Sequence, residues 1–378
     1  MKIVWLAHEA NMSGANICLL EYLDILKSKG VDNYLVVPFG KGDLPAKAAM
    51  LGISVKIIKY YSWAQPMHVS GKKHIYSFRK KIRNFFAVKQ IASVIKEWRP
   101  EYFATNTITT VVGAIAARKT NTKHIWFVHE FGEEDHGFVI AGNFKKGAGL
   151  INSLSNKIVF NSYAVSRKYL DIVPDQKSFI VDNPVLIKNV PLNTKDKPAI
   201  FSLVMLGQMA ASKNHKEAIL AIELCRQQGI DCCLEIIGKA ENKSYEEELK
   251  HLIKSKALET VIHFSGQVEH PETFLLHHHA LLMCSNKEAF GRVTVEALKC
   301  GLPVIAANTG GSLEIIKDGD NGYLYEAGNP SSLAEKIILL KQNYIEFDKQ
   351  VIASNAMDKY NVKNTGDQLM KVFKNNQS

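Results

Sequence analysis

Long hydrophobic runs and paired cysteines are missing from this sequence, and both absences narrow its class. No uninterrupted apolar stretch approaches the roughly 20 residues of a membrane-spanning helix. His8 and Glu9 follow the first apolar stretch too early for a secretory signal peptide. The 6 cysteines are scattered over 378 residues without a C-x-x-C pair, which indicates free thiols in a reducing compartment. We therefore expect a cytoplasmic protein.

Several motifs of common enzyme and binding classes are also missing. The loop around Gly14 lacks the G-x-G-x-x-G pattern of a dinucleotide oxidoreductase. His129, Glu130 and His136 do not follow the H-E-x-x-H spacing of zinc hydrolases, because position 133 is Glu133. The cluster His277–His279 is predicted on a helix, where consecutive side chains diverge and cannot bind one ion. We expect no metal and, without a nucleic-acid motif, no nucleic acid.

Charge of one sign is concentrated in a single segment. Residues 71–99 contain nine Lys or Arg residues and one acid, Glu97, within a chain of net charge +10. Apolar residues are interleaved with these charges at helical spacing, which predicts an amphipathic helix over His74–Trp98. Such a helix suits an anionic membrane surface or an anionic acceptor. A solvated basic face on an ordinary packed helix is the alternative.

The length of the chain and an apolar content of 46% predict two globular domains. Short β-rich runs alternate with helical patterns, which is typical of parallel sheets covered by helices on both faces. The first series of expected strands is Lys2–Ala7, Tyr34–Phe39, Ser54–Tyr60, Tyr102–Asn106, His124–His129, Lys157–Asn161 and Ser178–Val181. The second is Phe201–Leu206, Cys232–Ile237, Val261–Phe264, Ala280–Cys284, Val304–Ala307 and Gly322–Tyr325.

The polar, proline-containing segment 185–198 is predicted to link the two domains. We expect an N-terminal domain over residues 1–187 and a C-terminal domain over residues 188–361. A helix at about 362–375 is expected to pack back on the first domain. The predicted fold is α/β, with two facing Rossmann-like, doubly wound parallel-sheet domains. Ligands of such sheets bind at the carboxyl ends of the strands, which predicts a crevice between the domains.

The segment from Glu288 to Val304 carries the clearest chemistry. It places Glu288 and Glu296 on either side of Gly291, where a helix is expected to begin near Val293. Unpaired backbone N–H groups at a helix start attract a diphosphate. Gly291 permits close approach of the backbone, and carboxylates accept hydrogen bonds from adjacent sugar hydroxyls. The segment therefore suits a phosphate-linked sugar, although alone it also fits a surface loop and a favourable first-turn charge.

The ordered set of motifs in the second half resembles that of retaining GT-B glycosyltransferases, and most closely glycosyltransferase family 4. The resemblance is strongest from Leu203 to Gly328, where the matching residues are, in order, Leu206-Gly-Gln208, Lys213, Ile237-Gly238, Phe264-Ser-Gly266, Ser285, Glu288-Ala-Phe-Gly291, Glu296-Ala297, Gly301-x-Pro-Val304, Gly310-Gly311, Glu314 and Gly322.

The resemblance implies roles for individual residues. His129, Lys213 and Glu288 correspond to catalytic positions. His129 and Glu130 end a strongly apolar strand, so both side chains are expected to emerge at the crevice. Donor contacts are implied for Gly14, Gln208, Lys213, Gly238, Val268, Glu288, Phe290, Gly291, Arg292, Val293, Thr294 and Glu296. Acceptor contacts are implied for Glu130, Glu133 and His136.

The implied reaction is transfer of a sugar from a nucleoside diphosphate sugar to a hydroxyl acceptor. The acceptor would be a glycan or lipid-linked molecule in bacterial cell-surface polysaccharide or glycolipid synthesis. No cofactor and no essential divalent metal are implied, and residues 71–99 would attach the protein to the inner face of the membrane. One departure is Gln208, where the family usually has Arg, so part of the diphosphate clamp is weakened. A non-catalytic GT-B scaffold subunit and a GT-B epimerase or phosphorylase are the alternative hypotheses.

Overall fold

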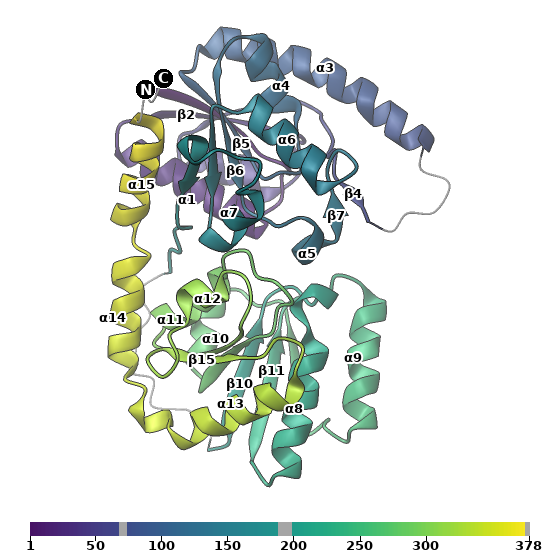
Figure 1. The fold of residues 1–378 in the computed structure, drawn as a ribbon, viewed down its shortest axis with the longest axis vertical. Coiled ribbons are helices and arrows are strands. Elements are labelled where there is room, and N and C mark those ends of the chain that lie inside the picture. The colour runs from purple at the N-terminus through teal and green to yellow at the C-terminus, as the bar shows by residue number, and fades with distance from the viewer. Residues whose placement is uncertain (68–73, 188–198, 375–378) are drawn as a thin grey trace. The chain divides into compact units, whose positions relative to one another are not determined.

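The protein is described here from a computed structural model covering residues 1–67, 74–187 and 199–374. The basic segment 71–99 and the linker 185–198 therefore fall partly outside the described residues. The chain divides into two compact units (Figure 1), the first comprising Met1–Pro184 with Val362–Ser378 and the second Val185–Asn361. The boundary lies three residues before the expected position 187.

The first unit is built on a seven-stranded parallel sheet with the order β3-β2-β1-β5-β6-β8-β9. Its strands are β1 (Lys2–Leu6), β2 (Asp32–Val37), β3 (Ser54–Ile57), β5 (Tyr102–Asn106), β6 (Lys123–Val128), β8 (Lys157–Phe160) and β9 (Ser178–Ile180). A separate antiparallel pair joins β4 (Gln65–Pro66) to β7 (Phe138–Val139). Its helices are α1 (Gly14–Ser28), α2 (Asp43–Met50), α3 (His74–Trp98), α4 (Val112–Lys119), α5 (Glu133–His136), α6 (Phe144–Leu154), α7 (Tyr163–Tyr169) and α15 (Val362–Lys374).

Alternate residues of β1 enter two different hydrophobic clusters. Ile3 and Trp5 pack with α1 and α15, whereas Val4 and Leu6 pack with α3 and α4. Successive side chains of a strand point to opposite faces, so helices cover both sides of this sheet. This is the doubly wound arrangement expected from the nearly continuous apolar strands.

Helix α15 follows the second unit in the sequence but completes the first. Leu369, Val372 and Phe373 lie in the cluster that contains Trp5. The Tyr102 hydroxyl donates to the Phe373 carbonyl at 2.8 Å, and the Lys157 ammonium donates to the Val372 carbonyl. These bonds satisfy carbonyls at a helix end that have no partner within the helix. The helix expected at about 362–375 is therefore held by both apolar and polar contacts.

The second unit contains a six-stranded parallel sheet with the order β12-β11-β10-β13-β14-β15. Its strands are β10 (Phe201–Leu206), β11 (Cys232–Ile237), β12 (Ile262–Gly266), β13 (Ala280–Met283), β14 (Val304–Ala307) and β15 (Gly322–Tyr325). Its α-helices are α8 (His215–Gln227), α9 (Lys243–Ser255), α10 (Pro271–Leu275), α11 (Arg292–Lys299), α12 (Ser312–Ile315), α13 (Pro330–Gln342) and α14 (Lys349–Lys359).

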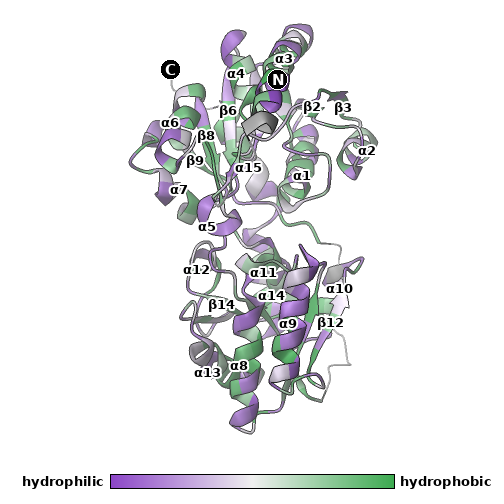
Figure 2. Cartoon of the chain, turned by 90° about the vertical axis from the view of Figure 1, so that its right-hand side faces the viewer, coloured by the Kyte–Doolittle hydropathy of each residue, from purple (hydrophilic) through white to green (hydrophobic). Residues whose placement is uncertain are grey.

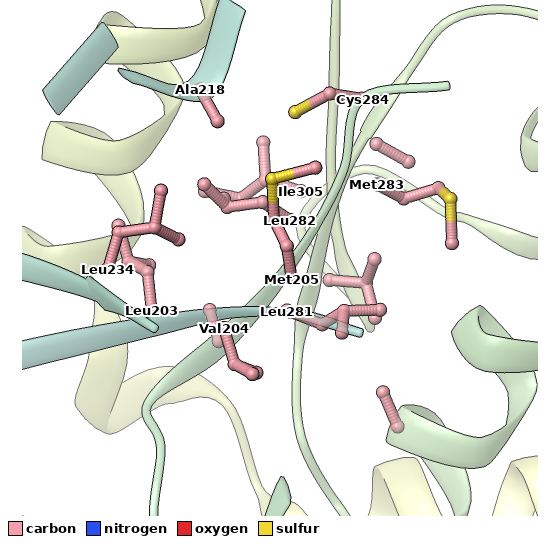
Figure 3. Packing of buried hydrophobic residues seen from close by; sticks show 14 of the residues in the cluster. Leu203, Val204, Met205, Ala218, Leu234, Leu281, Leu282, Met283, Cys284 and Ile305 are labelled. Atoms are coloured by element: carbon pink, nitrogen blue, oxygen red, sulfur yellow. The ribbon is translucent and has the colours of Figure 1, made fainter. Parts of the chain in front are cut away.

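The central strands of this second sheet are buried on both faces. Figure 3 shows Leu203, Leu234, Leu281 and Ile305 from four neighbouring strands packed in one cluster. Figure 2 shows hydrophobic stripes beside hydrophilic ones on α8 and α9, the pattern of helices that cover a sheet. The expected fold class, two Rossmann-like units with parallel sheets, is confirmed.

All six cysteines are free thiols. Among the described residues, no helix is both long and apolar enough to cross a bilayer.

Candidate functional site

The loops that follow β10 and β13 meet because these two strands are neighbours in the second sheet. Their pairing aligns Val204 with Leu281, so both strands end at the same edge. The backbone N–H of Asn286 donates to the Ser212 carbonyl at 2.9 Å and joins the two loops. At the sheet edge that is predicted to bind ligands, the loops after β10 and β13 are thus joined by a hydrogen bond.

Lys213 and Glu288, which come from these two loops, form the centre of the candidate site. The Lys213 Nζ lies 2.8 Å from Glu288 Oε2. The Ser285 hydroxyl donates to the same oxygen at 3.1 Å. The Glu288 side chain is 16% exposed and that of Lys213 37%, so solvent still reaches the ion pair. A hollow lined by both Lys213 and Gln208 opens beside it.

Two glycines set the backbone of the Glu288 loop. A Cβ on Gly310 would lie 2.1 Å from the Glu288 carbonyl oxygen, and one on Gly311 would lie 2.5 Å from the Phe290 carbonyl oxygen. The Gly311 N–H donates to the Glu288 carbonyl at 2.7 Å. Close backbone packing of this kind needs residues without a Cβ. The Gly310-Gly311 pair of the sequence therefore positions Glu288.

Gly291 is the N-cap of α11, with a left-handed φ of 99° that favours glycine. The first N–H groups of such a helix have no partner within it. Thr294 is fully buried in the first turn, and its hydroxyl has no hydrogen-bond partner among the described residues. Arg292 and Glu296 approach within 3.9 Å along the helix. Backbone donors, a cation and a carboxylate thus surround one helix start.

The remaining predicted donor residues fall into three groups. Gly238 follows β11 and packs on the β10 loop, since a Cβ there would lie 1.7 Å from the Gly207 carbonyl oxygen. Val268 and Val293 are half-buried against the core. Phe290 is buried, and its ring packs edge-on against Tyr360 at 5.8 Å. Phe290 therefore offers only its backbone to a ligand, because its side chain belongs to the core.

Two buried titratable groups, His215 and Glu217, lie in the first turn of α8, just after Lys213 in the chain. Burial and, to a smaller extent, the Lys213 charge lower the pKa of His215 to about 4. Burial also raises the pKa of Glu217. His215 is therefore neutral at physiological pH. His215 consequently places no second positive charge beside the Lys213 ammonium.

In the first unit, His129 follows β6 and is held by polar residues at the ends of neighbouring strands. Its Nε2 lies 2.8 Å from Asn106 Oδ1, at the end of β5. Asn106 Nδ2 donates to the Ala15 carbonyl at 3.1 Å, which fixes the orientation of the amide. Asn161 Nδ2 donates to the His129 carbonyl at 3.0 Å. Because an amide oxygen only accepts, the His129 Nε2 carries the hydrogen.

Glu130 does not emerge beside His129, contrary to the expectation for a pair at a strand end. It is buried, and its carboxylate accepts from the backbone N–H groups of Ile108 at 3.1 Å and His129 at 2.8 Å. Burial and, to a smaller extent, the charge of Asp135 raise its pKa to about 8. Successive residues of an extended chain alternate in direction, so Glu130 turns inward where His129 does not.

The other predicted acceptor residues lie on α5. The Glu133 carboxylate lies 3.8 Å from the Lys168 ammonium. His136 is exposed and stacks on Phe138 at 5.9 Å between ring centroids. Gly14 opens α1, and a Cβ there would meet nothing within 4 Å. The acceptor roles of Glu133 and His136 and the donor role of Gly14 remain predictions.

The prediction that His277–His279 lie on a helix is wrong, since α10 ends at Leu275. His278 contacts the Phe274 carbonyl and Glu235, whereas His279 contacts Ser202. The rings of His278 and His279 thus have separate structural partners. Within the described residues, no group of three His, Cys, Asp or Glu side chains is placed to hold a metal ion.

Sequence reasoning missed Asn106, which positions His129, and gave no role to Ser285, which positions Glu288. Both are polar residues at or just beyond the carboxyl end of a buried strand. That placement is a usable signal, because strand ends of a parallel sheet meet at one edge.

The chain is similar to known proteins in both sequence and fold. Residues 188–359 match the model of the family described as glycosyl transferases group 1. An N-acetyl-alpha-D-glucosaminyl L-malate synthase of Bacillus anthracis is 37% identical over 24% of this chain and 23% of its own length. A capsular polysaccharide biosynthesis glycosyltransferase of Staphylococcus aureus, CapM, is 24% identical over 49% of both chains. The chain thus spans half or less of these two relatives.

A solved structure is similar over nearly the full length. Anabaena Alr3699/HepE in complex with UDP superposes with a TM-score of 0.79 at 19% identity, covering 99% of both chains. The same protein in complex with UDP-glucose gives a TM-score of 0.77, again at 19% identity and 99% coverage of both chains. These two likenesses establish the fold.

Proposed function

We propose that the chain is a group 1 glycosyl transferase, the family whose model residues 188–359 match, and that it transfers a hexosyl group from a nucleoside diphosphate sugar. The acceptor is a hydroxyl group of a glycan or lipid-linked molecule. The observation that carries the proposal is the convergence of Lys213 and Ser285 on one oxygen of Glu288, beside the start of α11. A cation and a helix N-terminus can bind the diphosphate, and a carboxylate can accept hydrogen bonds from sugar hydroxyls.

In the proposed donor complex the diphosphate lies at the start of α11. Lys213 then turns from Glu288 to the diphosphate, where its charge stabilises the leaving group. Glu288, released from the ion pair, accepts hydrogen bonds from sugar hydroxyls. Glu296 binds the ribose hydroxyls, and Arg292 supplies charge that Gln208 lacks. The UDP and UDP-glucose complexes of the similar Anabaena protein support a nucleotide sugar as donor.

We further propose that transfer retains the anomeric configuration. The bond between the anomeric carbon and the phosphate oxygen breaks, and its electron pair leaves with the diphosphate. The anomeric carbon becomes an oxocarbenium-like centre, as in glycoside cleavage. The acceptor oxygen then bonds to it on the face that the diphosphate leaves. Its proton passes to a phosphate oxygen. His129, with hydrogen on Nε2, is proposed as the contact of the first unit to the sugar and acceptor.

The likeness to CapM supports a role in the synthesis of a bacterial cell-surface polysaccharide or glycolipid. Glu130, Glu133 and His136 remain our candidates for the acceptor side, with Glu130 acting through the backbone that it holds. No divalent metal is assigned to the reaction, because Lys213 and the helix start already supply positive potential to the diphosphate.

The test is donor binding followed by turnover. Purified full-length protein is screened by thermal shift against UDP-glucose and a panel of other nucleotide sugars. A true donor at 100 times its Kd stabilises the fold by about 2.7 kcal/mol. Release of the nucleoside diphosphate is then measured for the wild type, Lys213→Ala and Glu296→Ala. Stabilisation by no nucleotide sugar, or unchanged release in both variants, would contradict the proposal.

Gln208 favours a second candidate, a non-catalytic subunit that binds a nucleotide sugar without turnover. Its side chain lines the hollow beside Lys213, where an uncharged amide stabilises a leaving diphosphate less than a guanidinium does. Stabilisation by a donor with no product in the presence of any acceptor would favour this reading. An epimerised sugar or a phosphorolysis product would instead identify the epimerase or phosphorylase alternatives.

A further inference from the structure

Helix α3 carries apolar side chains on two opposite faces. One face is buried in the first unit and includes Val88, Ile91 and Ile95. The other face is exposed. The exposed fractions are 65% for Phe78, 43% for Ile82, 52% for Phe85 and 55% for Phe86. A surface helix that serves only to cover a sheet needs a single apolar stripe.

The spacing of these residues explains the two faces. Phe78, Ile82, Phe85 and Phe86 are separated by four, three and one residues, which places them along one side of the helix. Ile91 follows Ile82 by nine residues, which corresponds to about two and a half turns and therefore to the opposite side. Figure 1 shows α3 along the outside of its unit, with its N-terminal half extending past the sheet. The exposed row therefore lies on the side away from the core.

Positive charge surrounds this row. Arg79 and Lys81 are exposed and adjoin it on its two sides, since each residue turns a helix by about 100°. The Lys89 Nζ lies 4.7 Å from the centre of the Phe85 ring, and the Lys119 Nζ of the neighbouring α4 lies 5.7 Å from it. From Phe78 onward, Glu97 is the one acid of α3, and it lies at the other end of the helix. Charge and apolar surface thus coincide.

We propose that this surface docks on the face of an anionic phospholipid bilayer. We call it the α3 surface, defined by Phe78, Arg79, Lys81, Ile82, Phe85, Phe86, Lys89 and Lys119. The aromatic and aliphatic side chains enter the boundary between headgroups and acyl chains, and the lysine and arginine stems extend to the phosphates. The charge of the rim is complementary to the negative surface potential of such a membrane.

The combination of features separates a membrane from other partners. The exposure of phenylalanine side chains to water is unfavourable in free energy. These side chains are stabilised at a membrane interface, which is apolar on one side and charged on the other. A nucleic acid or anionic polymer would neutralise the basic residues but leave the phenylalanine row in water. The inference goes beyond the proposed transfer reaction and does not depend on the donor site.

The experiment measures binding of the full-length protein to vesicles by flotation. Vesicles of phosphatidylglycerol and phosphatidylcholine are compared with vesicles of phosphatidylcholine alone, at low and high salt. We expect binding to the anionic vesicles and at least tenfold weaker binding to the neutral ones. Binding should also weaken as salt rises, because the Debye length shortens from about 10 Å at 0.1 M to about 3 Å at 1 M.

Matched variants separate the contributions of the surface. Phe85→Ser with Phe86→Ser removes the apolar part, and Lys81→Glu with Lys89→Glu reverses the rim. Each double variant is expected to bind anionic vesicles at least tenfold more weakly. The controls Ile345→Ser with Val351→Ser, and Lys243→Glu with Lys254→Glu, alter exposed residues of the second unit and are expected to bind like the wild type. Thermal melting verifies that all variants fold.

A spectroscopic variant reports insertion directly. Phe85→Trp is expected to shift its fluorescence emission to shorter wavelength on anionic vesicles, because the indole leaves water. Equal binding by the Phe85→Ser, Phe86→Ser variant and the wild type would overturn the proposal, as would equal binding to neutral vesicles. Competition by single-stranded RNA that abolishes vesicle binding without an emission shift would assign the surface to an anionic polymer instead. Donor-induced thermal shifts of the variants show separately whether the proposed transferase site is intact.

Discussion

The two candidate site regions, one in each unit, are built on the same kind of strand edge but hold their functional side chains differently. Lys213 and Glu288 form a part-exposed ion pair on loops shaped by glycines. His129 is instead held by Asn106 and by the backbone around buried Glu130. An exposed ion pair exchanges partners at little cost, whereas a buried hydrogen-bonded network resists rearrangement. The candidate site of the second unit is therefore suited to an exchange of ion-pair partners, and that of the first unit is suited to holding its side chains in fixed positions.

Removing the exchangeable cation is expected to have the largest effect. Lys213→Ala should lower turnover of the nucleotide sugar roughly 10²- to 10³-fold, or about 3–4 kcal/mol, as loss of a group that stabilises developing charge does. The free energy of unfolding should change little, because the ion pair is partly exposed. Steady-state release of the nucleoside diphosphate measures the effect. Lys216→Ala, a substitution of the exposed partner of Glu248, is the control and should be neutral.

Distorting the backbone that carries Glu288 should come next. Gly310 has a φ of 57°, and a Cβ on it would overlap the Glu288 carbonyl. Gly310→Ala should therefore destabilise the protein by about 2–3 kcal/mol through strain and overlap.

Gly319 provides the matched control for Gly310, because its φ is 83° and a Cβ there would meet nothing within 4 Å. Gly319→Ala should cost about 1 kcal/mol, since it adds strain without overlap. Urea denaturation compares the two variants. Equal destabilisation would mean that close packing on the Glu288 loop contributes nothing.

The buried network around Glu130 should make the stability of the protein depend on pH. The pKa of Glu130 is raised from 4.5 to about 8 in the folded protein, so the native state retains a proton that the unfolded state releases. The stabilisation is therefore complete below about pH 4.5 and is lost as pH rises toward 8. Glu130→Gln lacks this titration, and its melting temperature should fall less between pH 5 and pH 9 than that of the wild type. Parallel profiles would show that Glu130 does not titrate in this window.

Chelation of divalent ions should have the smallest effect. Within the described residues no carboxylate and histidine cluster is placed to hold an ion, and Lys213 supplies charge at the proposed diphosphate position. We expect turnover to change less than twofold on addition of EDTA and on restoration with Mg²⁺. If EDTA lowered turnover tenfold or more and Mg²⁺ restored it, an ion carried by the donor, and not Lys213, would be the main group that stabilises the leaving diphosphate.

Strands and long helices could be predicted from the sequence because their periodicity reports burial. The strands Tyr102–Asn106 and Cys232–Ile237 and the helix His74–Trp98 match the structure residue for residue. Short polar elements such as α5 could not be predicted, since four residues show no period. The helix expected at His277–His279 failed for a related reason, because a histidine fits a turn as well as a helix.

The candidate site was predictable in its residues more than in their directions. The order of Lys213, Glu288 and Gly310-Gly311 along the chain indicated one region, and the structure brings these residues together. The inward direction of Phe290 and Glu130 was not predictable, because it depends on distant partners such as Tyr360 and Ile108. Local sequence does not encode such contacts. The same limitation concealed the Asn106 bond to His129.

The position of α15 has a consequence for the order of folding during synthesis. The cluster that contains Trp5 is completed by Leu369 and Phe373, which the ribosome adds only after the whole second unit has been made. Until then, the apolar surface that α15 covers is open to solvent or chaperones, while the second unit can already form its own core. In nascent chains that end before Val362, the second unit should therefore resist proteolysis while the first unit is still cleaved.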